Sequence, residues 1–246
     1  MISLSAVMFA FNEGRHIESV IRETLSVLAQ HTTDHELIVV DDGSTDETPR
    51  ILDGLAKAFD HLVLVRHPTN LGIGEAVHSG YERASKEYIC ILPADGQVTL
   101  AQYVNFFQPA IDGADLVLAR YTNRAEVDVF KRMVLSNGLR LLMRFLLGVN
   151  HHIDAAFLFR RALLDEIPLT SRSFFVNLEL PIRLIRAGFR VEERQMEVFP
   201  RISGSSKVVE LAKINRVAMD LLRLRFRLFH EQLAGWIAQR YPTGNP

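Results

Sequence analysis

Two neighbouring carboxylates follow directly on an apolar run in the first quarter of the chain. Residues 37–40 are all apolar, and Asp41-Asp42-Gly43-Ser44 comes next. Adjacent carboxylates repel each other, and a turn ordinarily needs only one Asp. Two of them can accept hydrogen bonds from a nucleobase N–H or from ribose hydroxyls. A turn followed by a helix cap explains the same residues, so the local sequence leaves both interpretations open.

A third carboxylate follows another apolar run. Residues 88–92 lead into a turn that contains Pro93, Asp95 and Gln97. Side chains two apart in an extended chain share a face, so Asp95 and Gln97 can direct oxygens at one cation. Hard cations such as Mg²⁺ and Mn²⁺ prefer oxygen ligands and keep positions for phosphate. A plain turn is the alternative.

Two further segments favour phosphate or a close backbone approach. Residues 201–207 combine Arg201 and Lys207 with three serines and a glycine, which suits an oxyanion, although a solvated loop has the same composition. The glycines around Asn70 and Gly72 do not form a dinucleotide fingerprint. The third glycine is missing, and the stretch follows the third predicted strand rather than the first. Two interpretations of this segment remain: a close approach of the backbone to a ligand, or an ordinary loop.

Strands that alternate with helices over residues 1–120 must position these turns. Short apolar runs predict the strands, and apolar residues at helical spacing predict the helices. The alternation predicts an α/β fold with a mostly parallel, Rossmann-like sheet covered on both faces. Ligands of such sheets bind beyond the carboxyl ends of the strands, where the turns at 12–13, 41–46 and 94–97 meet. The predicted strands are residues 3–11, 37–40, 62–65, 88–92 and 116–119, and the predicted helices are 17–28, 48–59 and 74–85.

The second half is less regular and opposite in charge. Residues 1–123 hold 8 Lys and Arg against 17 Asp and Glu, whereas residues 124–246 hold 20 against 12. An acidic half suits metal ions and a basic half suits phosphates or an anionic membrane, although uneven surface decoration gives the same pattern. The pattern predicts amphipathic helices in 129–149, a strand at 155–159, a helix at 174–187 kinked or broken at Pro181, and an extended segment at 189–198.

Residues 207–240 predict one long helix with an excess of basic residues. Seven Lys and Arg stand against three acids, with one polar stripe and otherwise apolar faces. We expect this helix to rest on a membrane surface or on a membrane-embedded partner, because anionic lipid attracts each nearby basic residue by about 1 kcal/mol. The alternative is that the apolar face packs on the protein's own domain. The polar stripe consists of Lys213, Arg216, Asp220, Arg223, Arg227 and Glu231.

The amino-acid composition limits the cellular compartment and the classes of binding partner that we expect. With a net charge of −1, we expect no nucleic-acid partner. Cys90 is the only cysteine, which excludes an intrachain disulfide and fits a reducing compartment. We find no apolar stretch of about 18 residues and no signal-peptide pattern, so we predict a cytoplasmic protein, peripheral at the cytoplasmic face of a membrane.

Taken together, the motifs resemble glycosyltransferase family 2. The resemblance covers about residues 3–208, and the most similar branch is that of the dolichyl- and polyprenyl-phosphate hexosyltransferases. The Asp-Asp-Gly-Ser segment after a strand is fairly specific to the family, and the basic segment 201–207 favours the lipid-phosphate branch. In chain order the motifs are Phe11-Asn12-Glu13, Val39-Val40-Asp41-Asp42-Gly43-Ser44-Thr45-Asp46, Asn70-Leu71-Gly72, Ala94-Asp95-Gly96-Gln97 and Arg201…Gly204…Lys207.

The resemblance implies a GT-A fold, a GDP- or UDP-linked sugar donor, a divalent cation and inversion at the anomeric carbon. It implies catalytic roles for Asp95, Asp154 and Arg201. Asp95 and Gln97 would hold Mg²⁺ or Mn²⁺ and the diphosphate, Asp154 would lie near the acceptor, and Arg201 with Lys207 would bind acceptor phosphate. The residues implied in donor binding are Phe11, Glu13, Asp41, Asp42, Asn70 and Gly72.

Two residues depart from the family pattern. Pro93 stands where the first acid of Asp-x-Asp usually lies, and Phe9 replaces a usual proline. Either Asp95, Gln97 and the donor diphosphate hold the cation alone, or catalysis has been lost. We predict hexose transfer to a polyprenyl or dolichyl phosphate. The alternatives are transfer to a saccharide or other soluble acceptor, and a catalytically impaired nucleotide-sugar-binding protein.

The expected organisation is a catalytic domain over residues 1–206 and an amphipathic helical segment over residues 207–246. Within the domain, residues 1–123 would form the nucleotide-sugar-binding half and residues 124–206 the acceptor-binding half. The change in net charge between the two halves supports this division.

Overall fold

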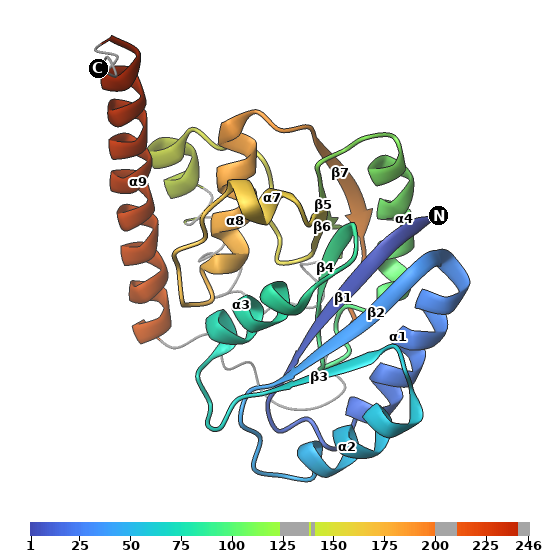
Figure 1. Cartoon of the computed structure of the whole chain (residues 1–246). Coiled ribbons are helices and arrows are strands. Elements are labelled where there is room, and N and C mark those ends of the chain that lie inside the picture. Colours follow the sequence, from blue (N-terminus) through green and yellow to red (C-terminus); the bar gives the residue numbers. More distant parts are fainter. Residues whose placement is uncertain (124–137, 139–140, 200–210, 241–246) are drawn as a thin grey trace, which may run out of the picture.

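The computed structural model describes residues 1–123, 138, 141–199 and 211–240, and the side chains of the last helix over residues 217–231. A seven-stranded sheet in the order β3-β2-β1-β4-β6-β5-β7 lies at its centre (Figure 1). The strands are β1 (Ile2–Ala10), β2 (Thr32–Asp41), β3 (Leu62–Arg66), β4 (Tyr88–Pro93), β5 (Leu116–Tyr121), β6 (Phe157–Arg160) and β7 (Val191–Met196). The helices are α1 (Ile17–His31), α2 (Thr48–Ala58), α3 (Ile73–Arg83), α4 (Leu100–Ile111), α7 (Leu163–Glu166), α8 (Val176–Ala187) and α9 (Leu211–Arg240).

The first half of the chain folds as its hydrophobic pattern predicts. Strands β1 to β4 form three parallel pairs, with β1 between β2 and β4. Strands covered on both faces have near-continuous apolar runs, because neither side meets water. The predicted strands and helices of residues 1–120 are confirmed, although β2 begins earlier than predicted, at Thr32.

Helix α4 lies outside the predicted elements. Its start is a capping box, in which the Thr99 backbone N–H donates to the Gln102 side-chain oxygen at 2.7 Å. Tyr103 on this helix is fully buried and donates its hydroxyl hydrogen to the Ile91 carbonyl at 2.7 Å. This hydrogen bond ties α4 to β4. The Thr-x-x-Gln spacing before an apolar stretch is the sequence signal for this helix.

The second half adds a mixed edge to the same sheet. Strand β6 is antiparallel to both β4 and β5, whereas β5 and β7 are parallel. The strand predicted at 155–159 and the extended segment predicted at 189–198 are confirmed as β6 and β7. Helix α8 continues through Pro181, so of the kink or break predicted there, the break is wrong. Leu180 and Ile182 on either side are fully buried, and their packing outweighs one lost backbone hydrogen bond.

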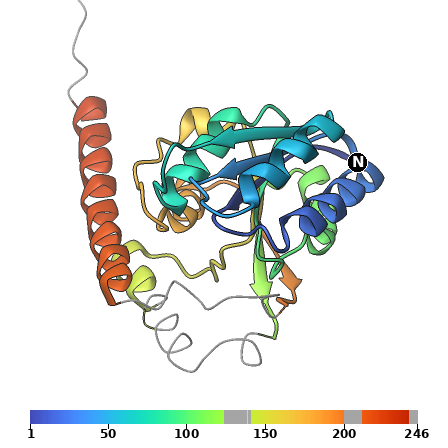
Figure 2. The same ribbon diagram turned by 90° about the horizontal axis from the view of Figure 1, so that it is seen from below.

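Two apolar cores lie on opposite faces of the sheet. Helices α1, α2 and α4 cover one core, and helices α3, α8 and α9 cover the other (Figure 2). The predicted long C-terminal helix is confirmed as α9, and its Leu221, Leu224 and Leu228 are buried in the second core. Among the described residues, no helix combines the length and the apolar content that crossing a bilayer requires. Of the helices predicted in 129–149, residues 141–147 are described and helical.

Candidate active site

The carboxyl ends of β1, β2 and β4 lie side by side at one edge of the sheet. Ala10 pairs with Asp41, and Phe9 pairs with both Val40 and Pro93. The strand order reverses at β1, and ligands of open α/β sheets bind at such a switch point. The turns that follow these three strands therefore meet at this edge, as predicted.

The turn after β1 is clamped to the turn after β2. Asn12 has a φ of 57°, a left-handed conformation that Asn tolerates better than most residues. Its backbone N–H donates to Ser44 Oγ at 2.9 Å, and its side-chain oxygen accepts from Thr45 N–H at 2.8 Å. The Glu13 N–H donates to Thr48 Oγ1 at 2.9 Å. These bonds fix Glu13 and the neighbouring half-buried Phe11 beside the Asp41–Asp42 turn.

Asp46 strengthens the same clamp. Burial opposes ionisation of its carboxyl, but hydrogen bonds from Thr48 and from the Gly14 N–H outweigh burial, so the Asp46 pKa lies below its usual value. The Gly14 N–H lies 3.1 Å from Asp46 Oδ2, and the Thr48 N–H lies 2.9 Å from Asp46 Oδ1. Asn12 and Asp46 thus hold the candidate site together.

Asp41 and Asp42 are both buried but face different partners. Asp41 Oδ1 accepts from the Ser44 N–H at 3.0 Å, which closes the turn, and its Oδ2 lies 4.0 Å from Arg66 Nε. Asp42 accepts from the Leu71 N–H and the Gly72 N–H at 2.9 Å each. Separate partners relieve the repulsion between the two adjacent carboxylates.

Asp42 fastens the loop that carries Asn70 and Gly72. His67 also donates to Asp42, from Nδ1 to Oδ1 at 2.8 Å, and its other ring nitrogen lies 2.9 Å from Ser79 Oγ on α3. Gly43 must be glycine here, because its φ is 70° and a Cβ would lie 2.3 Å from the carbonyl carbon of Thr69. The motif residues of the two turns are thus brought together. His67, which the motifs did not include, is identifiable from its place directly after β3.

Asp95 and Gln97 lie at the end of β4, next to this cluster. The Gln97 N–H donates to Asp95 Oδ1 at 3.1 Å around Gly96, whose φ is 72°. Both side chains are half-buried. The described residues contain no group of three or more His, Cys, Asp or Glu arranged to hold a metal. One carboxylate and one amide oxygen nevertheless fit a hard cation whose other ligands come from a diphosphate and water.

Asp154 reaches the same edge from the other side. It is buried, and its Oδ2 accepts from the Tyr121 N–H at the end of β5 at 3.0 Å. The Phe199 N–H, just after β7, donates to the Gln97 carbonyl at 2.9 Å, so the ends of β4, β5 and β7 converge. Arg201 and Lys207 lie outside the described residues. The roles assigned to all these side chains stay predictions.

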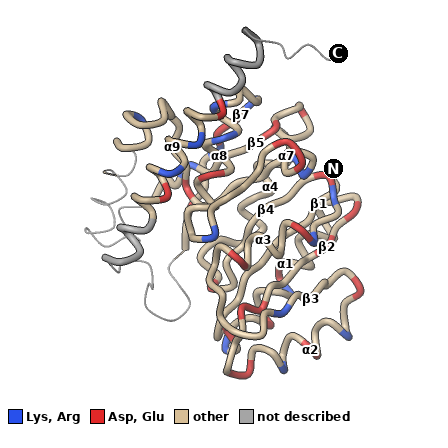
Figure 3. Tube along the Cα trace, turned by 60° about the vertical axis from the view of Figure 1, so that its left-hand side comes forward, with Lys and Arg blue, Asp and Glu red and all other residues tan. Residues whose placement is uncertain are grey.

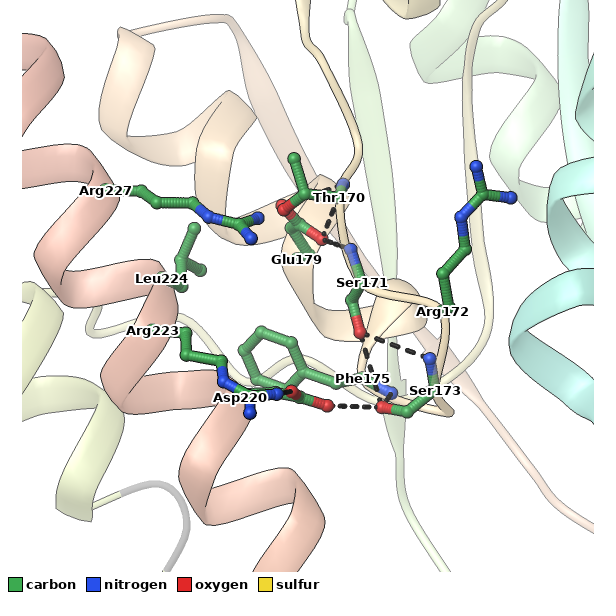
Figure 4. Close-up of a pocket in the computed structure, with 10 residues that line it drawn as sticks. All are labelled: Thr170, Ser171, Arg172, Ser173, Phe175, Glu179, Asp220, Arg223, Leu224 and Arg227. Atoms are coloured by element: carbon green, nitrogen blue, oxygen red, sulfur yellow. Dashed lines mark hydrogen bonds and ion pairs between the residues drawn. The ribbon is translucent and has the colours of Figure 1, made fainter.

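A second polar cluster, centred on Glu179 of α8, supports the site from outside. The Glu179 carboxylate is buried and accepts from the backbone N–H groups of Thr170 and Ser171 (Figure 4). It also accepts from Arg183 Nε at 3.0 Å. The loop held in this way presses on α3, because a Cβ on Gly74 would lie 2.2 Å from the Arg172 carbonyl oxygen. Helix α3 begins directly after Gly72, so this cluster buttresses the Asp42 loop.

Comparison with known proteins places the chain among glycosyltransferases. The model of glycosyl transferase family 2 matches residues 5–168. A similar protein is polyprenol monophosphomannose synthase of Mycolicibacterium smegmatis, 33% identical over 184 residues that cover 70% of this chain and 69% of that protein. Another is dolichyl-phosphate beta-glucosyltransferase of Trichomonas vaginalis, 24% identical over 96% of this chain and 76% of that protein.

A solved structure shows the same fold. Glucosyl-3-phosphoglycerate synthase of Mycobacterium tuberculosis, in complex with Mg²⁺ and uridine diphosphate, matches with a TM-score of 0.68 and 23% identity. The match covers 91% of this chain and 79% of that one. The sheet and its helices therefore form a GT-A fold, as the motif resemblance implied. The chain belongs to glycosyl transferase family 2 and is a glycosyltransferase.

Proposed function

We propose that the protein transfers a hexose, with inversion, from a GDP- or UDP-linked donor to a polyprenyl or dolichyl phosphate. The observation that supports this choice of acceptor is the 33% identity to polyprenol monophosphomannose synthase over 70% of this chain. The proposed location is peripheral, at the cytoplasmic face of a membrane, where such a lipid would be reached. The division into a donor half, an acceptor half and a C-terminal helical segment is part of the same proposal.

In this proposal the donor lies across the carboxyl ends of β1, β2 and β4. Phe11, Glu13 and the Asp41–Asp42 turn bind the nucleoside, and the loop of Asn70 and Gly72 closes beside it. Asp95 and Gln97 would hold Mg²⁺ or Mn²⁺, and the bound cation would supply positive charge opposite the leaving nucleotide diphosphate. The bond from the anomeric carbon to the diphosphate oxygen breaks, and the diphosphate leaves with the electron pair.

The acceptor phosphate attacks the anomeric carbon from the opposite face. A phosphate monoester has a second pKa of about 6, so its oxygen is largely ionised at neutral pH and needs no strong base. A new carbon–oxygen bond forms to that phosphate, and the configuration inverts. Asp154 orients the acceptor, while Arg201 and Lys207 bind its charge. Were the acceptor a hydroxyl, Asp154 would be the candidate general base.

Two observations favour alternatives. The solved glucosyl-3-phosphoglycerate synthase structures include complexes with phosphoglyceric acid, a soluble molecule, so transfer to a soluble acceptor is the second candidate. Pro93 at the end of β4 replaces a usual acid, so a nucleotide-sugar-binding protein without turnover is the third. In the second candidate the sugar label ends on a soluble molecule, and in the third candidate no label is transferred.

The test supplies radiolabelled GDP- and UDP-hexoses with short-chain polyprenyl phosphate, with and without Mn²⁺, followed by organic extraction. Label should enter the organic phase only with lipid and cation present. Arg201→Ala should raise the KM for lipid more than that for donor, and Lys57→Ala, an exposed cation on α2, should change neither. Label that stays aqueous across the donor panel, while a soluble acceptor is glycosylated, establishes the second candidate. Donor binding without any transfer establishes the third.

A further inference from the structure

Helix α9 has two apolar faces, and only one of them is used by the fold. Leu221, Leu224 and Leu228 are buried against the domain. Met219, Leu222, Phe226 and Phe229 are exposed, and at 66% Phe226 is the most exposed of the four. Their spacing of three, four and three residues places them in one stripe, which spans about 80° of the helix surface at 3.6 residues per turn.

A second helix beside α9 also exposes apolar side chains. Residues 141–147 form a helix beside α9 (Figures 1 and 2). Met143 and Leu147 are buried in the same core as the α9 leucines. Leu141, Leu142 and Phe145 are exposed, and Phe145 is 78% accessible. These two helices carry seven of the eleven large hydrophobic side chains that are exposed among the described residues. Such a concentration marks an interaction surface.

The charges around the stripe are basic. Arg223 and Arg225 flank it on its two sides at helical spacing, and Arg144 is exposed on the second helix. Basic positions recur along the described part of α9 (Figure 3). The two acids of residues 217–231 are engaged with the domain. Asp220 accepts from Ser173 Oγ at 2.6 Å and also lies 3.2 Å from the guanidinium of Arg223, whose side chain is still 66% exposed. Glu231 lies 3.2 Å from the Arg183 guanidinium.

We propose that this surface, made of the outer stripe of α9 and the helix 141–147, docks on an anionic lipid bilayer. The phenyl and leucyl side chains enter the headgroup boundary, and the flanking arginines extend to lipid phosphates. Charge distinguishes this partner from a second copy of the chain. A symmetric pairing of two such faces would bring arginines against arginines, whereas an anionic bilayer neutralises them.

Docking on a bilayer extends the proposed function, because the proposed acceptor is a membrane lipid. The inference rests on the proposed function in this one respect. With α9 packed on the domain, the docked surface fixes the domain against the bilayer. Docking itself needs no sugar, no cation and no turnover, so it is measured separately.

The experiment is co-sedimentation of the full chain with vesicles of phosphatidylcholine alone and with 30% phosphatidylglycerol. Binding should be at least tenfold stronger with the anionic vesicles and should weaken in 0.5 M NaCl. Phe226→Glu/Phe229→Glu should reduce binding to anionic vesicles at least tenfold. Ile111→Glu, at an apolar residue of α4 that is 50% exposed, should not. Circular dichroism and binding of GDP and UDP by calorimetry check that each variant is folded.

Equal vesicle binding by the wild type and the double variant overturns the docking surface. A second result would also overturn it: the wild type binds no vesicles but forms a dimer, and Phe226→Glu/Phe229→Glu dissociates that dimer. The surface is then occupied by a second copy of the chain. If the protein forms glycolipid in detergent but binds no vesicles, the docking proposal is wrong. The proposed function is then still supported. Tight vesicle binding lost in the double variant supports docking even when no glycolipid is made.

Discussion

Asp41 and Asp42 show how two identical neighbours take different tasks. Asp42 is enclosed by three donors, from Leu71, Gly72 and His67, whereas Asp41 closes its own turn and lies 4.0 Å from Arg66. A carboxylate that accepts from two backbone N–H groups and an imidazole has little capacity left for a ligand. We therefore predict that Asp42 affects donor binding mainly through the loop it holds.

Asp42→Asn tests this division of labour. The new amide keeps one oxygen and turns its NH2 group against either the Leu71 or the Gly72 N–H donor, so we expect the free energy of unfolding to fall by about 1–3 kcal/mol. Urea unfolding followed by circular dichroism measures it. Asp53→Asn, at an exposed carboxylate on α2, should cost far less. Undiminished stability together with lost donor binding would instead indicate a direct nucleoside contact by Asp42.

Asp95→Asn tests the cation role at the end of β4. A turn Asn is well tolerated, so stability should change little. Turnover should fall by about 10²-fold or more, the usual loss for one transition-state electrostatic contact. Initial rates over a Mn²⁺ series, compared with rates in excess chelator, measure the effect. A variant with full activity, or a wild type indifferent to chelator, contradicts the cation role.

The sequence predicted the site residues better than their partners. Asp41, Asp42, Asn70 and Gly72 do converge, because parallel strands bring their following turns to one edge. The pairing of Asp42 with His67 depends on a contact between residues 25 positions apart, which local patterns do not encode. The positive φ of Asn12 likewise follows from its bonds to the neighbouring turn.

At the scale of elements, the Glu179 cluster joins three helices. Glu179 and Arg183 lie on α8, Arg183 also meets Glu231 of α9, and the loop that Glu179 holds packs on α3. The Arg183 side chain is only 4% exposed, and its Nη2 has no hydrogen-bond partner among the described residues. Without the charge of Glu179, this guanidinium would keep only the exposed Glu231 as an acidic partner among the described residues.

Glu179→Gln should therefore lower the free energy of unfolding by about 1–3 kcal/mol, because buried donors lose a charged acceptor while Glu231 still pairs with Arg183. Thermal unfolding by calorimetry measures it. Glu166→Gln, at an exposed position of α7, should stay within about 0.5 kcal/mol of the wild type. Similar stability of the two variants would show that the cluster is not a support of the fold.

Elements with a strong period were predictable, and elements set by tertiary packing were not. The parallel strands β1 to β4 contain apolar runs and were found, whereas the antiparallel direction of β6 depends on which strand edges it meets. Pro181 signals a break by itself, but buried neighbours keep α8 whole. The sequence showed that α9 has more than one apolar face. Which of these faces packs on the domain depends on the contact between α8 and α9, which the sequence does not give.

For the whole molecule, Cys90 reports on global unfolding. It lies in β4, fully buried, and burial raises the pKa of its thiol well above the usual range. A raised pKa reduces the thiolate fraction at pH 8, and the thiolate is the reactive form. A thiol reagent should therefore leave the native protein unlabelled until it unfolds, whereas exposed Lys57→Cys should label within seconds. Rapid labelling of native wild-type protein would contradict a rigid centre of the sheet.

The position of β6 in the sheet has a consequence for the newly made chain. Tyr88 of β4 pairs with Arg160 of β6, so one edge of an almost wholly apolar central strand stays open until much later residues have been made. At synthesis rates of about 5–20 residues per second, that interval is on the order of 4–14 s. An open apolar strand edge is a template for pairing with other chains. On the ribosome, this protein therefore passes through an aggregation-prone stage that ends when its antiparallel strand emerges and fills the gap.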